Sequence, residues 1–195
     1  WAAAEGNESA VRALLKHGAN ISAMDKRGHV ALHLAAIEGH ENITVALLEH
    51  GAPLDDEDWS GDTSLIKACE HGNERIVNIL LRAGADKFIN KKNHYGASAL
   101  VRAVQHGYDR LVLALVNHGA QSSVLDHGDL LCATSRLHLN TIRLLFGEGI
   151  NFYKTDARGE RLLRTVLWNF RPGKLSNLLF VESEFAPRCF FACGS

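Results

Sequence analysis

The 195-residue sequence has few cysteines, few prolines and almost no net charge. Its four cysteines are too few and too unevenly spaced for a disulfide-stapled secreted domain, so we expect the cytoplasm, with the nucleus as the alternative. Three prolines exclude a collagen-like or proline-rich chain. The 21 Lys and Arg residues balance 22 Asp and Glu residues, which disfavours nucleic acid and anionic membranes as partners.

Long apolar runs and an initiator methionine are also missing. No stretch approaches the about 18 consecutive apolar residues that a spanning helix needs, so we expect no membrane partner. The sequence begins at Trp1 and its single methionine is Met24. We therefore expect the chain to be part of a longer polypeptide.

Glycine, in contrast, is frequent and periodic. A Gly-Ala pair follows a short apolar run at intervals of 33, 33 and 35 residues, at Gly18, Gly51, Gly84 and Gly119. A second glycine recurs 12 residues before each of these, at Gly6, Gly39, Gly72 and Gly107. The earlier glycine fits a tight turn between two helices, and the later one fits the left-handed residue that ends the second helix.

The segments between these glycines have the apolar spacing of short helices. In the best unit they are residues 31–36 and 43–48, where apolar side chains recur at three- and four-residue steps. Helices of about two turns are marginal alone in water, so each must be held by its neighbours. The pattern predicts helix-turn-helix units whose stacking builds one elongated core.

One segment of the period resembles a known repeat signature. Residues 25–36, DKRGHVALHLAA, are similar to the T-P-L-H-x-A pattern of ankyrin repeats, and weaker copies begin at Asp58 and Asn93. The resemblance implies an all-α ankyrin-repeat solenoid, in which stacked helix-turn-helix units carry β-turn tips. It also implies that His33 hydrogen-bonds the backbone of the neighbouring β-turn.

The period divides the chain into an array over residues 1–165 and a tail. The predicted units are about 1–24 (truncated), 25–57, 58–92, 93–125, 126–155 and 156–180 (divergent). A two-residue insertion near residues 87–92 should lie in a loop. We interpret residues 181–195 as a C-terminal cap or tail, with a docking peptide or the start of another domain as alternatives.

The histidines and acidic residues do not form a recognisable chemical site. His17, His50 and His118 occupy equivalent places in their units; such places lie about 8–10 Å apart in adjacent units, and two ligands of one zinc cannot be that distant. Residues 55–58 are acidic but lack the ligand pattern of a calcium loop, so a solvated loop tip is predicted. Cys69 fits a core position. We expect no metal, no cofactor and no enzymatic activity.

The resemblance places partner binding on a concave face formed by the β-turn tips and the first helix of each unit. Trp59 and Tyr95 are its strongest candidates, because exposed aromatic residues are enriched in binding hot spots. The alternative is that they pack on the adjacent tip and stiffen it. The candidate residues are Lys26, Arg27, His29, Ile37, Glu38, Trp59, Asp62, Glu70, His71, His94, Tyr95, Gln105 and His106.

The resemblance implies a protein-interaction module or scaffold, a monomeric array whose partner is another protein. A different class of function stays open: a regulatory or substrate-recruiting segment of a larger enzyme or of a ubiquitin-ligase adaptor. Residues 165–195 would distinguish the two, since an adaptor segment should form a compact apolar helix.

Overall fold

The computed structural model describes residues 1–121 together with residues 125, 129, 140, 141, 144 and 145. Outside these described residues lie most of the predicted unit 126–155, the whole of the predicted unit 156–180 and the segment 181–195. Residues 165–195, which would distinguish the two classes of function, are therefore not described. Within the described part, the chain forms helices and turns and no strand.

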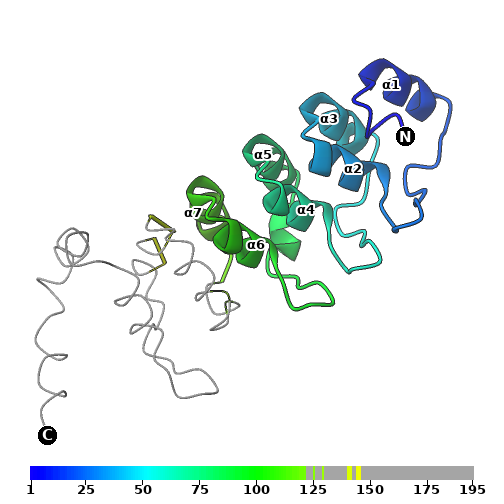
Figure 1. Cartoon of the computed structure of the whole chain (residues 1–195). Helices are drawn as coiled ribbons and strands as arrows, with labels where there is room; N and C mark the ends of the chain where they lie inside the picture. Colours follow the sequence, from blue (N-terminus) through cyan, green and yellow to red (C-terminus); the bar gives the residue numbers. More distant parts are fainter. Residues whose placement is uncertain (122–124, 126–128, 130–139, 142–143, 146–195) are drawn as a thin grey trace, which may run out of the picture.

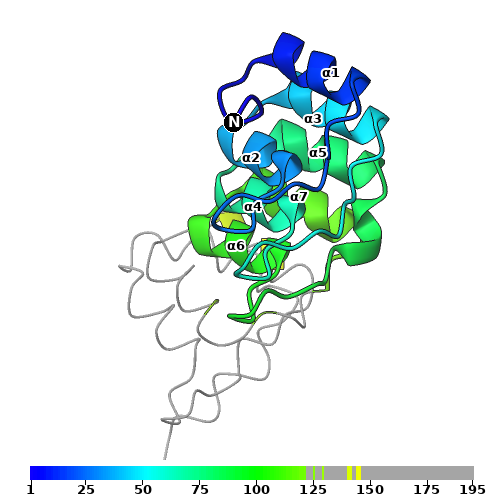
Figure 2. The same ribbon diagram turned by 90° about the vertical axis from the view of Figure 1, so that its right-hand side faces the viewer.

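The helices stack in two layers (Figures 1 and 2). One layer contains α2, α4 and α6, and the other contains α1, α3, α5 and α7, each helix packing on the next in its layer. Their bounds are α1 Glu8–Lys16, α2 Ala31–Glu38, α3 Glu41–Glu49, α4 Ser64–Glu70, α5 Glu74–Arg82, α6 Ala99–His106 and α7 Asp109–Asn117. The two helices predicted from residues 31–36 and 43–48 are confirmed as α2 and α3.

The core runs through the whole stack. Leu47, Leu80 and Leu115 occupy equivalent positions in α3, α5 and α7, and each is fully buried. Burying one such side chain stabilises the fold by roughly 1.5 to 3 kcal/mol, which short helices cannot gain alone. Cys69 is buried in α4, and this burial raises the pKa of its thiol, as expected for a core cysteine.

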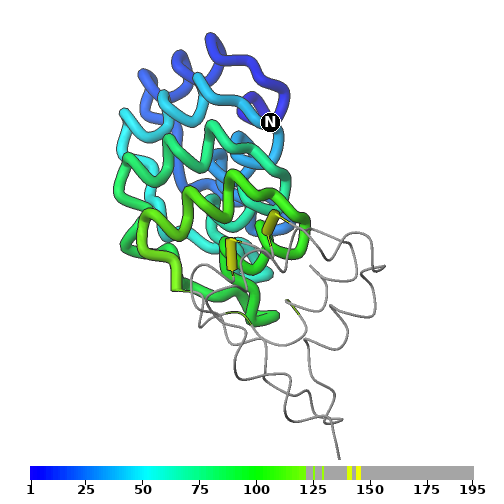
Figure 3. The backbone as a smooth tube through the Cα atoms, turned by 90° about the vertical axis from the view of Figure 1, so that its left-hand side faces the viewer, coloured from blue at the N-terminus to red at the C-terminus, as the bar shows by residue number. Residues whose placement is uncertain are grey.

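The periodic glycines adopt the conformation that their spacing predicts. The eight glycines of the two series have φ values between 71° and 101°, in the left-handed region that favours glycine. Gly39 and Gly107 end α2 and α6 directly. The tube view shows the chain reversing in the same way in each unit (Figure 3).

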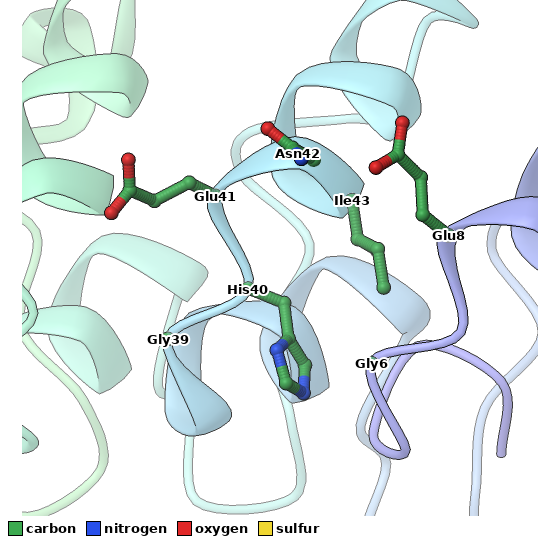
Figure 4. Close-up of a pocket in the computed structure, with 7 residues that line it drawn as sticks. All are labelled: Gly6, Glu8, Gly39, His40, Glu41, Asn42 and Ile43. Carbon is green, nitrogen blue, oxygen red and sulfur yellow. The ribbon is translucent and has the colours of Figure 1, made fainter.

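The residue after each turn glycine covers the turn of the preceding unit. The His40 imidazole lies against the Gly6 turn (Figure 4), with its Nε2 3.1 Å from the Ala4 carbonyl oxygen. In the next unit Asn73 donates from Nδ2 to the Ala36 carbonyl, 2.7 Å away. The Ala4 carbonyl belongs to the turn before Gly6 and the Ala36 carbonyl lies near the end of α2, so in both places one unit satisfies a carbonyl of the unit before it.

The histidines at the ends of the second helices act locally. In His17, His50 and His118 the Nδ1 atom lies 2.8 Å from the carbonyl oxygen four residues earlier. A carbonyl can only accept, so each imidazole donates from Nδ1 and satisfies a helix-terminal carbonyl. These histidines form a row of helix caps.

The β-turn tips protrude from the α2, α4 and α6 side of the stack (Figure 1). Each tip begins with an Asp or Asn whose side chain accepts two backbone N–H groups of its own turn, as Asp58 does from Ser60 and Asp62. Backbone bonds then join the tips: the Trp59 N–H donates to the Arg27 carbonyl at 3.1 Å. Ser60 accepts the corresponding bond from the His94 N–H, at 2.9 Å.

The predicted insertion near residues 87–92 adjoins a helical turn that the sequence did not suggest. A 3-10 helix, η1 (Ala85–Phe88), follows the left-handed Gly84. Asn90 then holds the loop to the next unit, donating to the Gly119 carbonyl and accepting from the Gln121 N–H. The extra residues coil beside the stack, so the register of α5 and α7 is kept.

We predict that Gly28→Ala destabilises the array more than Gly51→Ala. Both glycines have a φ of 79°, so either alanine costs about 1 kcal/mol of backbone strain. A Cβ at Gly28 would also lie 2.7 Å from the Trp59 backbone nitrogen, whereas one at Gly51 meets nothing within 4 Å. Urea unfolding should give an extra loss of about 1 to 3 kcal/mol for Gly28→Ala. Equal losses would contradict the close contact between tips.

Candidate protein-binding face

The three tips and the helices behind them form one side of the stack, here called the tip-side face. It comprises residues 25–29, 58–62 and 93–97 with helices α2, α4 and α6 (Figure 1). Among the predicted residues, Lys26, Arg27, Glu38, Trp59, His71, His94 and Tyr95 are exposed there, and Ile37, Glu70, Gln105 and His106 are partly exposed.

Two of the predicted face residues are buried, which corrects the sequence interpretation. The exposed fractions of His29 and Asp62 are 9% and 2%. His29 lies between two carboxylates, with Nδ1 3.2 Å from Asp25 and Nε2 3.5 Å from Asp58. These side chains hold neighbouring tips together and are not available to a partner.

Asp58 also differs from the expectation of a solvated acidic loop. Its exposed fraction is 4%, and the Lys67 Nζ lies 3.1 Å from its carboxylate and 2.7 Å from that of Asp62. The other Asp62 oxygen accepts from Asn93 Nδ2 at 2.7 Å. Lys67 occupies the α4 position that Leu34 holds in α2 and Arg102 holds in α6, and a lysine among the apolar residues of so short a helix is the signal that sequence reasoning missed.

The surroundings of Asp58 and Lys67 favour the charged form of each. Burial acts to raise the pKa of Asp58, but the Asp62 N–H, the Lys67 ammonium and the Ser60 N–H outweigh it and hold that pKa below its usual value. Burial acts to lower the pKa of Lys67, but hydrogen bonds to Asp62 and Asp58 outweigh it and raise that pKa. The Lys67 ammonium therefore lies between two carboxylates inside the face.

His33 joins units in the way that the repeat resemblance implies. Its Nδ1 accepts from the Val30 N–H at 3.2 Å, so the imidazole is neutral at that atom. Its Nε2 then donates to the Asp62 carbonyl of the next tip, 2.9 Å away. Burial lowers the pKa of this imidazole, because a charged ring would be poorly solvated and would lose the Val30 bond.

The two predicted aromatic residues have different surroundings. The Trp59 ring lies over Gly28 and its Nε1 donates to the Lys26 carbonyl at 3.2 Å, so it packs on the adjacent tip while remaining 66% exposed. His94, not Tyr95, takes the same place over Gly61. Tyr95 is 79% exposed. The alternative interpretation is therefore correct for Trp59, although its outer ring face stays open.

A hollow of about 400 Å³ lies at the N-terminal end, beside α1 and α2, and two shallow grooves lie on the opposite layer. One of about 340 Å³ lies between the Gly6 and Gly39 turns, with Glu8 and Glu41 at its edges (Figure 4). Among the described residues, no group of three or more His, Cys, Asp or Glu side chains could hold a metal ion. None of the helices in that part of the chain is long and apolar enough to cross a membrane.

The repeat geometry agrees with a family comparison. Residues 1–91 match the family model for ankyrin repeats, in three copies. Residues 1–91 therefore carry ankyrin repeats. No curated protein matches the chain. Ankyrin repeats are generally protein-interaction modules and are typically non-catalytic.

We predict that Lys67→Met destabilises the ankyrin array by about 2 to 3 kcal/mol, because two buried carboxylates lose their cation. Arg75→Met, which removes an exposed pair with Glu41, should change stability by less than about 0.5 kcal/mol. Urea unfolding of both variants measures these two losses in the free energy of unfolding. Similar losses in both would contradict a buried cation.

The pKa of Asp58 is lowered on folding. The stability that this carboxylate contributes is therefore present above about pH 4 and is lost as the pH falls further.

We predict that His33 makes the array sensitive to mild acid. Its pKa is lowered on folding, so the unfolded chain takes up the proton first and stability falls as the pH drops below about 6.5. The slope that one such group adds is at most about 1.4 kcal/mol per pH unit. His33→Gln should remove that part of the pH dependence of the unfolding free energy. An unchanged slope would mean that His33 does not titrate in this way.

Proposed function

We propose that this ankyrin array is a scaffold that binds a partner protein through its tip-side face. The observation that carries the proposal is the exposure of two aromatic side chains, Trp59 and Tyr95, on tips that backbone bonds hold rigidly together. Large exposed aromatic side chains contribute much to interfaces, and the outer face of the Trp59 ring stays open although its inner face packs on the adjacent tip. Rigid tips also reduce the entropy lost on binding.

The proposed site is narrower than the sequence interpretation. It contains the exposed and partly exposed members of the face and omits His29 and Asp62. Its residues are Lys26, Arg27, Ile37, Glu38, Trp59, Glu70, His71, His94, Tyr95, Gln105 and His106. We place this role in the cytoplasm or nucleus and propose a monomeric array, and the free thiol of Cys69 fits a reducing compartment.

A pull-down from cell extract with quantitative mass spectrometry tests the proposal. Tyr95→Ala should lower capture of the specific partner severalfold without changing the melting temperature, because the side chain is exposed and no buried contact is lost. Trp59→Phe keeps an aromatic ring but removes the hydrogen bond from the indole to the Lys26 carbonyl. This variant therefore distinguishes the role of Trp59 in supporting the adjacent tip from its role in contacting the partner.

Leu113→Ala provides the matched control. Leu113 is an exposed apolar residue on α7, in the other helix layer. We expect this variant to capture the partner as the wild type does. Normal capture by Tyr95→Ala, or equal losses in Tyr95→Ala and Leu113→Ala, would exclude the tip-side face as the binding site.

A further inference from the structure

Adjacent tips place positive charges beside aromatic rings. The residues concerned are Lys26, Arg27, Trp59, His94 and Tyr95, here called the tip ridge, and all five are exposed. The Trp59 Nε1 bond to the Lys26 carbonyl fixes the indole next to the first tip. The cations and the indole therefore form one continuous surface.

The acidic groups near the tip ridge are already engaged. Asp25 accepts the N–H groups of Arg27 and His29, at 2.7 and 2.8 Å. Asp58 and Asp62 are buried and paired with Lys67. Asp58 and Asp62 are therefore withdrawn from the surface, and the exposed Asp25 carboxylate is held by the N–H groups of its own turn.

The cations of the tip ridge are not engaged in this way. Within the described part of the chain, neither the Lys26 ammonium nor the Arg27 guanidinium lies in an ion pair. Both side chains are exposed. Their own backbone carbonyls are the two acceptors of Trp59: Lys26 accepts from the indole Nε1 and Arg27 accepts from the backbone N–H. The charge that the first tip offers to an incoming ligand is therefore positive.

The aromatic part of the ridge favours apolar contact. The indole Nε1–H of Trp59 already donates to the Lys26 carbonyl. The indole therefore presents its ring face, and not a hydrogen-bond donor, to a ligand. Tyr95, on the next tip, presents a ring that is 79% exposed. A cation could stack on these rings, but Lys26 and Arg27 would repel it from Trp59, whereas an apolar or aromatic side chain meets no such penalty.

We propose that the tip ridge binds an acidic peptide segment of the partner protein, an inference that rests on the proposed function. The segment's carboxylates face Lys26 and Arg27, and an adjacent apolar or aromatic side chain covers Trp59 and Tyr95. A nucleic acid fits less well. Only two of the ridge residues are permanent cations, whereas the affinity for a continuous phosphate backbone grows with the number of Lys and Arg residues that contact it.

Peptide selection against the immobilised full chain tests the inference. A random-peptide display library should yield peptides that combine Asp or Glu with an apolar or aromatic residue. Their affinities are then measured by fluorescence anisotropy with the wild type and with Lys26→Glu/Arg27→Glu. We expect an affinity loss of about tenfold or more, with weaker wild-type binding at about 500 mM than at about 50 mM salt.

Arg82→Glu/Lys87→Glu is the matched control. It changes the net charge by the same amount, but both residues are exposed outside the tip ridge, at the end of α5 and in η1. We expect this variant to bind the selected peptides within about twofold of the wild type, because long-range charge alone is screened at physiological salt. Thermal melts of both double variants establish that each remains folded.

The outcomes separate this inference from the broader proposal. Selected peptides without an acidic bias, equal affinity losses in the two double variants, or tighter binding of a thymidine oligonucleotide than of any peptide would each overturn the acidic-peptide inference. If non-acidic peptides bind and Tyr95→Ala abolishes their binding, the tip-side face still binds protein. If no selected peptide responds to Tyr95→Ala or to Lys26→Glu/Arg27→Glu, both proposals fail.

Discussion

The contact that each unit makes with the next is the interaction on which the rest of the structure depends. Helices of seven to nine residues cannot persist alone, so their stability comes from the helices stacked beside them. The same dependence extends to polar groups. His40, Asn73 and His33 each satisfy a carbonyl of a neighbouring unit. Polar groups at the edge of one unit are thus completed by the unit beside it.

The binding face follows from this stacking. Because Trp59 and His94 donate backbone bonds across successive tips, three otherwise short turns become a single stiff surface. Lys67 and the aspartates beneath it compensate their charges internally. What remains open to a partner is a small set of aromatic rings and cations on the outer side of the tips, and their spacing is fixed by the repeat.

Local and periodic signals were enough to predict much of this architecture. The left-handed glycines, helices α2 and α3, the buried Cys69 and the His33 bond follow from short-range chemistry or from the repeat resemblance. The burial of Asp58 and Asp62 could not be predicted in the same way, because it depends on a lysine several residues away and on an asparagine of the next unit. Only folding brings these groups together.

Hydrogen exchange at single amides tests most directly whether bonds between units make the tips a rigid binding surface. The Trp59 and His94 amides, which donate across the tips, should exchange at least about 100-fold more slowly than the Lys26 amide, which has no backbone acceptor within the described residues. Similar, fast exchange at all three amides would mean that the tips move independently of one another and do not form a rigid surface.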